Sequence, residues 1–379
     1  MKYLLSDCYT RKAFDIYNIL CIYFDPKEII LASDNGSRLK NKLIYNQQIY
    51  SLRKNSEDIF TNDLLLISCL YTNESIVYIP VEEDTTTLFY LFIKKNTVNK
   101  FLFCLPSETF FNIANDKKLL NKYCLEYSIP APKIFEKKEI LLWGEEEFIP
   151  LIIKPRKGSG SIGIIHIDNF MQLSKIKDIQ LHDYVIQEKI SAGKDVKGAF
   201  FLCQKGEVVS SYSHERIRTF PTDGGVTVFS KYSFNTQIID IGKQLLKSLE
   251  WSGFAMIEFL WDEKESIYKI IEINPRLWGS ILLSEFSGNK FVYNYVALCT
   301  DNKILKPKIK DYAKIRWIPF EILGLIKKRF YDKNFFVLDK KNTCYINFTY
   351  SNWFSSIWFH YFFYFNLTNF NKLISKWKK

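Results

Sequence analysis

The sequence predicts an α/β domain followed by an α+β region, and three observations indicate this fold class. Up to about residue 105, short apolar runs that end in small or acidic residues alternate with helix-length segments, which is typical of an open parallel sheet. From about residue 150, apolar runs are joined by short turns, which indicates antiparallel strand pairs. The length of 379 residues and the apolar fraction of 47% allow two or three packed units.

Four apolar runs are the expected strands of the first domain, with helices between them. They are KYLLSD (2–7), EIILASD (28–34), DLLLISCL (63–70) and SIVYIPVEED (75–84). Loops at the carboxyl ends of parallel strands often carry ligand-binding residues. The acidic stretch 82–85 lies at such a strand end, although it also fits a solvated turn. We place a domain boundary near residue 106.

The elements after this boundary follow from helical and period-two spacing. Residues 107–128 have helical spacing, with Ser107 as the N-cap, and end before Pro130. A strand is expected over 183–190 and a helix over 238–251. Two hairpins complete the region, one over 195–218 that turns at Lys205 and Gly206, and one over 253–276 that turns within 262–266.

A basic, glycine-rich stretch over 151–168, LIIKPRKGSGSIGIIHID, has Gly158, Gly160 and Gly163 at G-x-G-x-x-G spacing. Apolar runs flank the glycines on both sides, so the loop joins strand to strand. This excludes a dinucleotide-binding turn, which needs a helix directly after the glycines. The chain also lacks the Gly-Lys-Ser/Thr end of a Walker A loop and the H-R-D and D-F-G motifs of protein kinases. From the stretch alone, an ordinary hairpin turn and a phosphate-binding loop both stay open.

The second hairpin carries a candidate metal site. Its turn places Glu258 opposite or nearly opposite Glu272, and Asn274 lies on the same face because side chains alternate with period two. Two carboxylates and an amide oxygen form a ligand set that suits Mg²⁺ or Mn²⁺. Solvent-facing charges on an edge hairpin are the alternative, but Glu258 lies within the apolar run 254–260, where an unpaired charge is costly.

The order of these features resembles the ATP-grasp superfamily. After the open-sheet domain come Asp116-Lys117 opening a helix, Lys154 before the Ser/Gly loop, Gln187-Glu188-Lys189-Ile190, Glu258, and Glu272-Ile-Asn274-Pro-Arg276. The resemblance covers roughly residues 1–300, and its most specific element is E-I-N-P-R placed fourteen residues after Glu258. Within the superfamily, the chain looks most like the carbamoyl phosphate synthetase-like members that join a carboxylate to an amine.

The resemblance implies a domain order and a function. We expect a Rossmann-like pre-ATP-grasp domain over 1–106 and an ATP-grasp fold of two α+β subdomains over 107–300, divided near residue 190 into a small and a large subdomain. A basic, aromatic-rich region over 301–379 would follow. The implied activity is an ATP-dependent carboxylate-amine ligase that forms an acyl phosphate and then an amide, with ADP and phosphate as products. A non-catalytic ATP-binding regulator on the same fold and a basic protein that binds nucleic acid or a membrane surface remain alternatives.

Roles for individual residues also follow from the resemblance. Lys117 and Lys154 would hold the ATP phosphates, and Arg276 would stabilise the transferred phosphoryl group. Arg216 would face a substrate carboxylate, while Arg218 is expected to be a surface cation and His214 a structural residue. The loop over the phosphates would consist of Lys157, Gly158, Ser159, Gly160, Ser161 and Gly163. Adenine would contact Glu188, Lys189 and Ile190; ribose would contact Asp195; and Mg²⁺ or Mn²⁺ would bind Glu258, Glu272 and Asn274.

Charge and cysteine usage bound the partners and the compartment. The eight cysteines show no C-x-x-C spacing, and the first apolar stretch carries four charged residues, so we expect reduced thiols, no signal peptide and a cytoplasmic protein. Residues 301–379 hold 16 Lys and Arg against 5 Asp and Glu, and no charged residue occurs over 342–371, which contains NWFSSIWFHYFFYF. This tail either contacts the inner face of a membrane or packs on the core. We expect small-molecule substrates and no specific nucleic-acid binding, and a homodimer is open.

Overall fold

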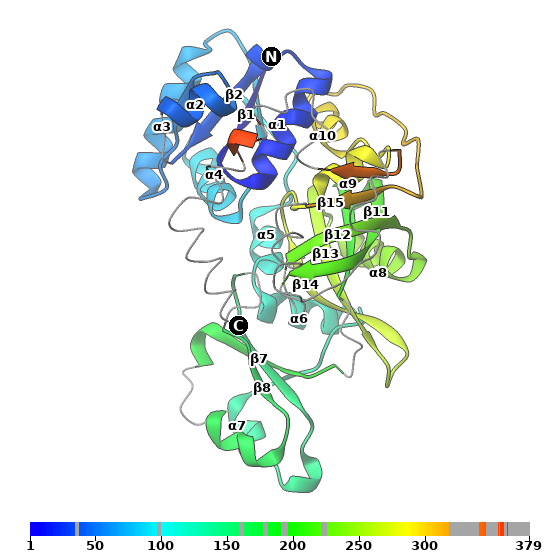
Figure 1. The fold of residues 1–379 in the computed structure, drawn as a ribbon. Coiled ribbons are helices and arrows are strands. Elements are labelled where there is room, and N and C mark those ends of the chain that lie inside the picture. Colours follow the sequence, from blue (N-terminus) through cyan, green and yellow to red (C-terminus); the bar gives the residue numbers. More distant parts are fainter. Residues whose placement is uncertain are drawn as a thin grey trace.

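The computed structural model describes residues 1–34, 38–96, 100–158, 163–176, 181–190, 196–220, 226–317, 341–345, 355, 357–359 and 362. Three sheets organise these residues (Figure 1). In this view the N-terminal sheet lies at the top, a large sheet lies at the centre, and a small sheet lies at the bottom. The predictions for Ser159, Gly160, Ser161, Asp195 and most of the tail fall outside the described residues.

The N-terminal sheet has five parallel strands in the order β3-β2-β1-β4-β5, which confirms the expected open α/β sheet. Its strand order reverses direction between β1 and β4, so the loops after these two strands flank the crevice where such sheets bind ligands. The strands are β1 (Lys2–Leu5), β2 (Ile29–Ser33), β3 (Ile49–Ser51), β4 (Ile76–Ile79) and β5 (Phe101–Leu102). The helices are α1 (Arg11–Tyr23), α2 (Arg38–Ile44), α3 (Glu57–Leu70) and α4 (Glu83–Lys95).

The strand expected over 63–70 is wrong, because these residues form the second half of α3. Ser56 caps this helix by accepting a hydrogen bond from the Ile59 N–H, and two acidic residues occupy its first turn. Its buried residues Phe60, Asp63, Leu64 and Ile67 recur at helical spacing, so one helical stripe covers the sheet. β3 and β5 are only three and two residues long, too short to produce a strand pattern.

The helix expected over 107–128 is two helices, α5 (Glu108–Ala114) and α6 (Lys117–Glu126). Ser107 caps α5 as predicted. Asp116 interrupts the expected single helix because it is the N-cap of α6. Its carboxylate accepts hydrogen bonds from the Lys118 and Leu119 N–H groups. The side chain of Arg156 binds the same carboxylate at 2.6 Å, which joins this helix start to the small sheet.

The small sheet is antiparallel, with the order β6-β9-β7-β8. It has its own hydrophobic core, in which Leu151, Ile153 and Ile186 pack against Ile140 and Ile176. The glycine-rich loop joins β7 to β8, so the predicted strand-to-strand connection is confirmed. The elements are β6 (Ile134–Phe135), α7 (Lys137–Ile140), β7 (Leu151–Pro155), β8 (Ile165–Ile167) and β9 (Tyr184–Glu188).

The large sheet has seven strands in the order β14-β13-β10-β11-β12-β15-β16, and both predicted hairpins lie within it. Its strands are β10 (Lys197–Gln204), β11 (Glu207–Phe220), β12 (Val226–Ser233), β13 (Gly253–Asp262), β14 (Ile267–Asn274), β15 (Lys314–Arg316) and β16 (Thr343–Tyr345). Residues of β10 alternate between its two faces: Phe201 packs toward α8 (Thr236–Ser248), whereas Phe200 packs with Trp278 on the opposite face. Helices α9 (Ile281–Phe286) and α10 (Phe291–Cys299) contribute to that opposite face.

The N-terminal sheet and the large sheet share one hydrophobic core. Leu5 and Phe14 belong to the same buried cluster as Phe200 and Trp278. The buried Tyr295 hydroxyl on α10 donates to the Tyr78 carbonyl of β4 at 2.8 Å. The boundary that we propose near residue 106 lies between β5 and α5 and stays a proposal. Among the described residues, no helix combines the length and hydrophobicity needed to cross a bilayer.

Candidate functional site

The predicted carboxylate pair lies in register on the second hairpin. Glu258 on β13 pairs directly with Glu272 on β14, and the ladder shifts by one residue immediately after this pair. The Asn274 amide donates to the Glu272 carboxylate at 3.2 Å, so all three predicted metal ligands share one face of the hairpin. The side chains of Glu258 and Glu272 are 17% and 19% exposed, which leaves both open to a ligand.

Three cations surround this pair. Lys117, the first residue of α6, lies with its Nζ 3.3 Å from the Glu272 carboxylate. Arg216 on β11 donates to the Glu258 carboxylate at 3.0 Å. Lys154 on β7 is buried, and its Nζ donates to the Ile271 carbonyl of β14 at 3.3 Å. The structure therefore brings together, from α6, β7, β11, β13 and β14, residues that the sequence proposes for metal, phosphate and substrate binding.

Neighbouring charges give the two buried carboxyl groups pKa values shifted in opposite directions. Burial, with the nearby Glu272 charge, raises the pKa of Glu258 to about 7 despite the Arg216 contact. Burial also acts to raise the pKa of Glu272, but Lys117 and Lys154 outweigh it and hold that pKa below its usual value. Burial lowers the pKa of Lys154 to about 8, and the like charge of Lys117 acts in the same direction. A divalent cation beside Glu258 would favour the ionised carboxylate, and a phosphate beside Lys154 would favour the charged ammonium.

Arg276 is held by three hydrogen bonds. Its guanidinium donates to Glu83 at 2.6 Å, to the Asn274 side-chain oxygen at 3.0 Å and to the Leu277 carbonyl at 3.1 Å. Glu83 is the first residue of α4, in the acidic stretch that the sequence also allowed as a solvated turn. That interpretation is wrong, because Glu83 binds Arg276, and neighbouring Glu82 binds the Lys12 ammonium at 2.8 Å. The position of the acidic stretch at a strand end was the signal available in the sequence.

The residues proposed for adenine lie at the end of β9. The Glu188 carboxylate accepts from Lys269 at 2.8 Å and from the Lys133 N–H at 3.0 Å. The Lys189 N–H donates to the Pro150 carbonyl at 2.8 Å. A base that hydrogen-bonded to the Glu188 carboxylate or the Lys189 N–H would have to replace these bonds. The adenine roles of Glu188, Lys189 and Ile190 stay predictions.

A second carboxylate cluster was missed in the sequence. Glu188, Asp262 and Glu265 converge within the reach of one metal ion. The Lys269 ammonium already lies among them, 2.8 Å, 2.8 Å and 2.9 Å from the three carboxylates, and this side chain is 3% exposed. The cluster is therefore an ion-pair network that joins the small sheet to the hairpin turn.

The two ends of the glycine-rich loop are placed beside Lys117. Its Nζ donates to the Gly158 carbonyl at 2.7 Å. Gly158 has φ +104° and Gly163 has φ +76°, backbone conformations that side chains disfavour. A Cβ at Gly163 would also lie 3.1 Å from the Pro155 ring. Lys157 is exposed at the start of the loop.

Two further residues lie beside the site. The Arg218 guanidinium lies over the Phe229 ring at 4.6 Å. His214 is buried, its Nδ1 lies 3.4 Å from the Ser280 hydroxyl, and burial lowers the pKa of the imidazole to about 3. A neutral, buried imidazole agrees with a structural role.

We expect His214→Gln to change how stability depends on pH. The unfolded chain protonates this imidazole below about pH 6.5, but the folded protein resists protonation until about pH 3. The stabilising contribution is therefore full above the unfolded pKa and is lost as pH falls toward 3. Between pH 5.5 and 4.5, urea unfolding should show the wild-type free energy falling by about 1.4 kcal/mol more than that of the variant. His182→Gln, at an exposed histidine, is the control; identical slopes for wild type and His214→Gln would contradict the assignment.

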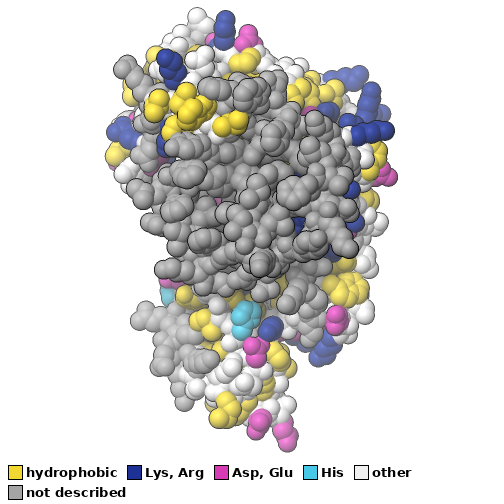
Figure 2. Space-filling model, in the orientation of Figure 1, with side chains coloured by type: hydrophobic (Ala, Val, Ile, Leu, Met, Phe, Trp, Pro, Cys, Tyr) yellow, Lys and Arg dark blue, Asp and Glu magenta, His cyan; other side chains and the backbone are white. Residues whose placement is uncertain are grey.

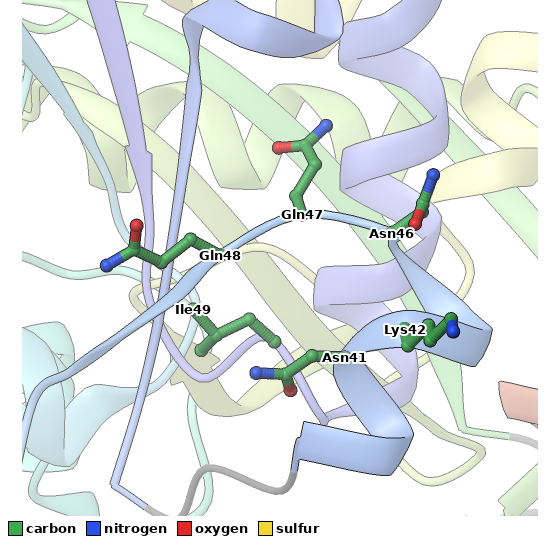
Figure 3. A pocket seen from close by; sticks show the side chains of 6 residues that line it. All are labelled: Asn41, Lys42, Asn46, Gln47, Gln48 and Ile49. Carbon is green, nitrogen blue, oxygen red and sulfur yellow. The ribbon is translucent and has the colours of Figure 1, made fainter.

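A pocket of about 410 Å³ lies elsewhere, in the N-terminal domain (Figure 3). Its lining comes from the end of α2 and the approach to β3 and consists of Asn41, Lys42, Asn46, Gln47, Gln48 and Ile49. No predicted site residue lines this pocket. Its amides and single lysine supply neither a carboxylate pair nor a nucleophile, so we assign the chemistry to the hairpin face instead.

A family model matches the part of the chain that contains this candidate site. Residues 114–280 match the family model of the ATP-grasp domain, which spans α6, the small sheet, the hairpin and Arg276. No curated protein matches the chain.

Solved structures share the fold at low sequence identity. Biotin carboxylase from Campylobacter jejuni, in complex with an ATP analogue, is 16% identical with a TM-score of 0.62, covering 83% of this chain and 74% of that one. The biotin carboxylase domain dimer of Hydrogenobacter thermophilus 2-oxoglutarate carboxylase, in complex with MgADP and bicarbonate, is 13% identical with a TM-score of 0.62, covering 83% and 73%. An L-amino acid ligase from Bacillus licheniformis is 11% identical with a TM-score of 0.58, covering 83% and 78%. The chain therefore contains an ATP-grasp domain over residues 114–280.

Proposed function

We propose that the protein is an ATP-dependent ligase that joins a carboxylate to an amine through an acyl phosphate. One observation carries the proposal: Glu258, Glu272, Asn274 and Arg276 meet on one hairpin face with Lys117 and Lys154 beside them. The L-amino acid ligase among the similar folds supports amide formation, and the neighbour solved with MgADP supports use of ATP and Mg²⁺.

The residues present fit a bound Mg²⁺ or Mn²⁺ ion. Glu258, Glu272 and Asn274 offer oxygen ligands, and because burial and the neighbouring Glu272 charge raise the pKa of Glu258, a bound cation would favour its ionised form. The ion would neutralise the ATP phosphates and draw them toward the hairpin. Lys154 and Lys117 would bind phosphate oxygens, and a phosphate beside Lys154 would favour its charged form.

The proposed reaction needs no covalent nucleophile from the protein. A carboxylate oxygen of the substrate attacks the γ-phosphorus, the bond to the β–γ bridging oxygen breaks, and ADP leaves. The amine then attacks the carbonyl carbon, phosphate leaves, and the amine loses a proton. Arg276 would stabilise the charge on the transferred phosphoryl group, and Arg216 would pair with the substrate carboxylate in place of Glu258. The loop from Lys157 to Gly163 would cover the phosphates and keep water from the acyl phosphate.

A non-catalytic ATP-binding regulator on the same fold is the second candidate. The complete set of oxygen ligands with Arg276 argues against it, because binding alone does not require a group that stabilises transferred phosphoryl charge. The domain limits near residues 106, 190 and 300, the cytoplasmic location and a homodimer stay proposals. Most of the tail over 342–371 lies outside the described residues. Its described residues Cys344 and Phe359 are buried in the shared core, and Phe359 stacks on Phe14 with ring centres 4.3 Å apart, which favours packing on the core over membrane contact.

Hydroxylamine provides the test of the proposed function, because it captures an acyl phosphate as a stable hydroxamate. We expect ADP release that depends on one class of carboxylate in a screen of amino acids, small carboxylates and sugar acids, with hydroxamate formed in equal amount. ATP binding without ADP release for every carboxylate would favour the regulator. ADP release without hydroxamate would contradict the acyl phosphate.

A further inference from the structure

The segment between α10 and β15 is fixed to the core by its backbone, although it contains no helix or strand. We call residues 303–310 the basic shelf. The side chain of Asn294, which is fully buried on α10, accepts from the Leu305 N–H at 2.9 Å and donates to the Leu305 carbonyl at 3.0 Å. The Lys310 N–H donates to the Ser287 carbonyl at 2.8 Å. The shelf is therefore held in one position rather than left as a free loop.

A glycine in the turn before α10 makes this position possible. Gly288 has φ +93°, and a Cβ there would lie 2.0 Å from the Lys308 carbonyl. The Lys308 N–H donates to the Gly288 carbonyl at 3.3 Å, so the two segments touch along their backbones. Any side chain at residue 288 would push the shelf away from the core.

The basic shelf presents four lysines without carboxylate partners. Lys303, Lys306, Lys308 and Lys310 are exposed. In the part of the chain that the structure describes, the carboxylates that form salt bridges pair with other cations and not with these four. Figure 2 shows Lys and Arg side chains gathered at the upper right, over the region where Figure 1 draws the segment after α10. Among the described residues, the four shelf lysines form a concentration of positive charge without an ion pair, and Lys310 Nζ lies 5.4 Å from the centre of the Phe286 ring.

Exposed apolar side chains lie within and beside these lysines. Ile309 is 43% exposed and Tyr312 is 48% exposed. Lysines interleaved with an aliphatic and an aromatic side chain suit a surface that has anionic headgroups above an apolar layer. The four shelf cations are all lysines, whereas recognition of nucleic acid commonly uses the planar fork of arginine.

We propose that the basic shelf is a docking surface for an anionic lipid membrane. Its lysines attract the headgroups, while Ile309 and Tyr312 contact the interface. The reaction site lies on the hairpin of β13 and β14, and no residue assigned to that site belongs to the shelf. This inference therefore does not depend on which reaction the ATP-grasp domain performs.

The test uses the full chain and a triple variant, Lys303→Gln, Lys306→Gln and Lys308→Gln. The control variant removes the same charge elsewhere, by Lys138→Gln, Lys247→Gln and Lys264→Gln, which are exposed lysines on α7, α8 and the hairpin turn. Each protein is sedimented at low salt with vesicles of phosphatidylcholine alone or of phosphatidylcholine with phosphatidylglycerol. Thermal unfolding checks that both variants keep the fold.

We expect the wild type and the control variant to bind only the vesicles with phosphatidylglycerol, and to lose this binding at high salt. If each lysine that is removed lowers the vesicle partition coefficient roughly fivefold, the shelf variant should partition about a hundredfold more weakly than the wild type. Equal losses in the two variants would overturn the proposal, because net charge and not the shelf would then control binding. So would wild-type binding to uncharged vesicles, no binding at all, or shelf-dependent binding to single-stranded RNA or an acidic peptide in place of the vesicles.

Discussion

Glu272→Gln should lower Mg²⁺-dependent ATP turnover by on the order of a thousandfold while leaving the fold intact. The substitution keeps the shape and the hydrogen-bonding oxygen of the side chain but removes one of the two charges that face the metal. It also leaves Lys117 without the carboxylate that lies 3.3 Å from its Nζ. ADP release at saturating ATP and varied Mg²⁺ measures the effect.

The control lies on the same hairpin. Glu263→Gln removes a carboxylate from the exposed turn that joins β13 to β14, and its ADP release should match that of the wild type. Unchanged ATP turnover in Glu272→Gln would contradict the assignment of Glu272 as a metal ligand. Loss of the cooperative unfolding transition in Glu272→Gln would show instead that the carboxylate is needed for folding, and Mg²⁺ binding by Glu272→Asp would then decide the assignment.

Glu83→Gln should lower kcat by about ten- to a hundredfold with a smaller change in the KM for ATP. The variant loses a charge-assisted hydrogen bond of 2.6 Å to the Arg276 guanidinium, and such bonds contribute about 1.5–3 kcal/mol. Arg276 keeps its bonds to Asn274 and Leu277, so its position loosens without being lost. Steady-state kinetics with separate kcat and KM values measures the split.

Two comparisons separate this positioning role from general destabilisation. Glu57 is the first residue of α3, the helix position that Glu83 holds in α4, and it forms an ion pair with Lys95. Glu57→Gln removes the charge of this side chain and its ion pair, and it should leave kcat unchanged. In an Arg276→Lys background, Glu83→Gln should have little further effect, because the two residues act as one unit. Full additivity of the two substitutions would show that Glu83 does not act through Arg276.

The hairpin site could be predicted from the sequence because its information is local. The tight turn at 262–266 brings Glu258 and Glu272 close together on the two strands. A regular ladder from that turn would pair Glu258 with Ile271, and the register shift between Glu258 and Phe259, which the sequence did not indicate, produces the direct pair with Glu272. The strand-to-strand position of the glycine-rich loop also followed from its apolar flanks. By contrast, the apolar run at 63–70 fits either a buried strand or a buried helix stripe, and only the Ser56 cap upstream indicates the helix.

Contacts between distant segments could not be predicted. Glu83 and Arg276 lie 193 residues apart, and nothing in the spacing of either segment indicates that they meet. The Lys269 network with Glu188 is a similar case, since it depends on how the small sheet lies against the hairpin turn. Such contacts depend on the packing of whole sheets, which period and capping rules do not describe.

The distribution of the hydrophobic cores has a mechanical consequence for the reaction centre. The N-terminal and large sheets share a core and should move as one rigid body, whereas the small sheet packs on its own core and reaches the rest through polar contacts such as Arg156 with Asp116 and Lys269 with Glu188. If the small sheet rotates relative to the other two sheets, its ion pairs can be replaced by contacts with water. Separating a buried apolar interface would instead cost much free energy. Lys154 travels with the small body, and Glu258, Glu272 and Arg276 belong to the large one. A nucleotide that contacts both bodies would hold them together. The free energy of closure would therefore come from nucleotide binding rather than from folding.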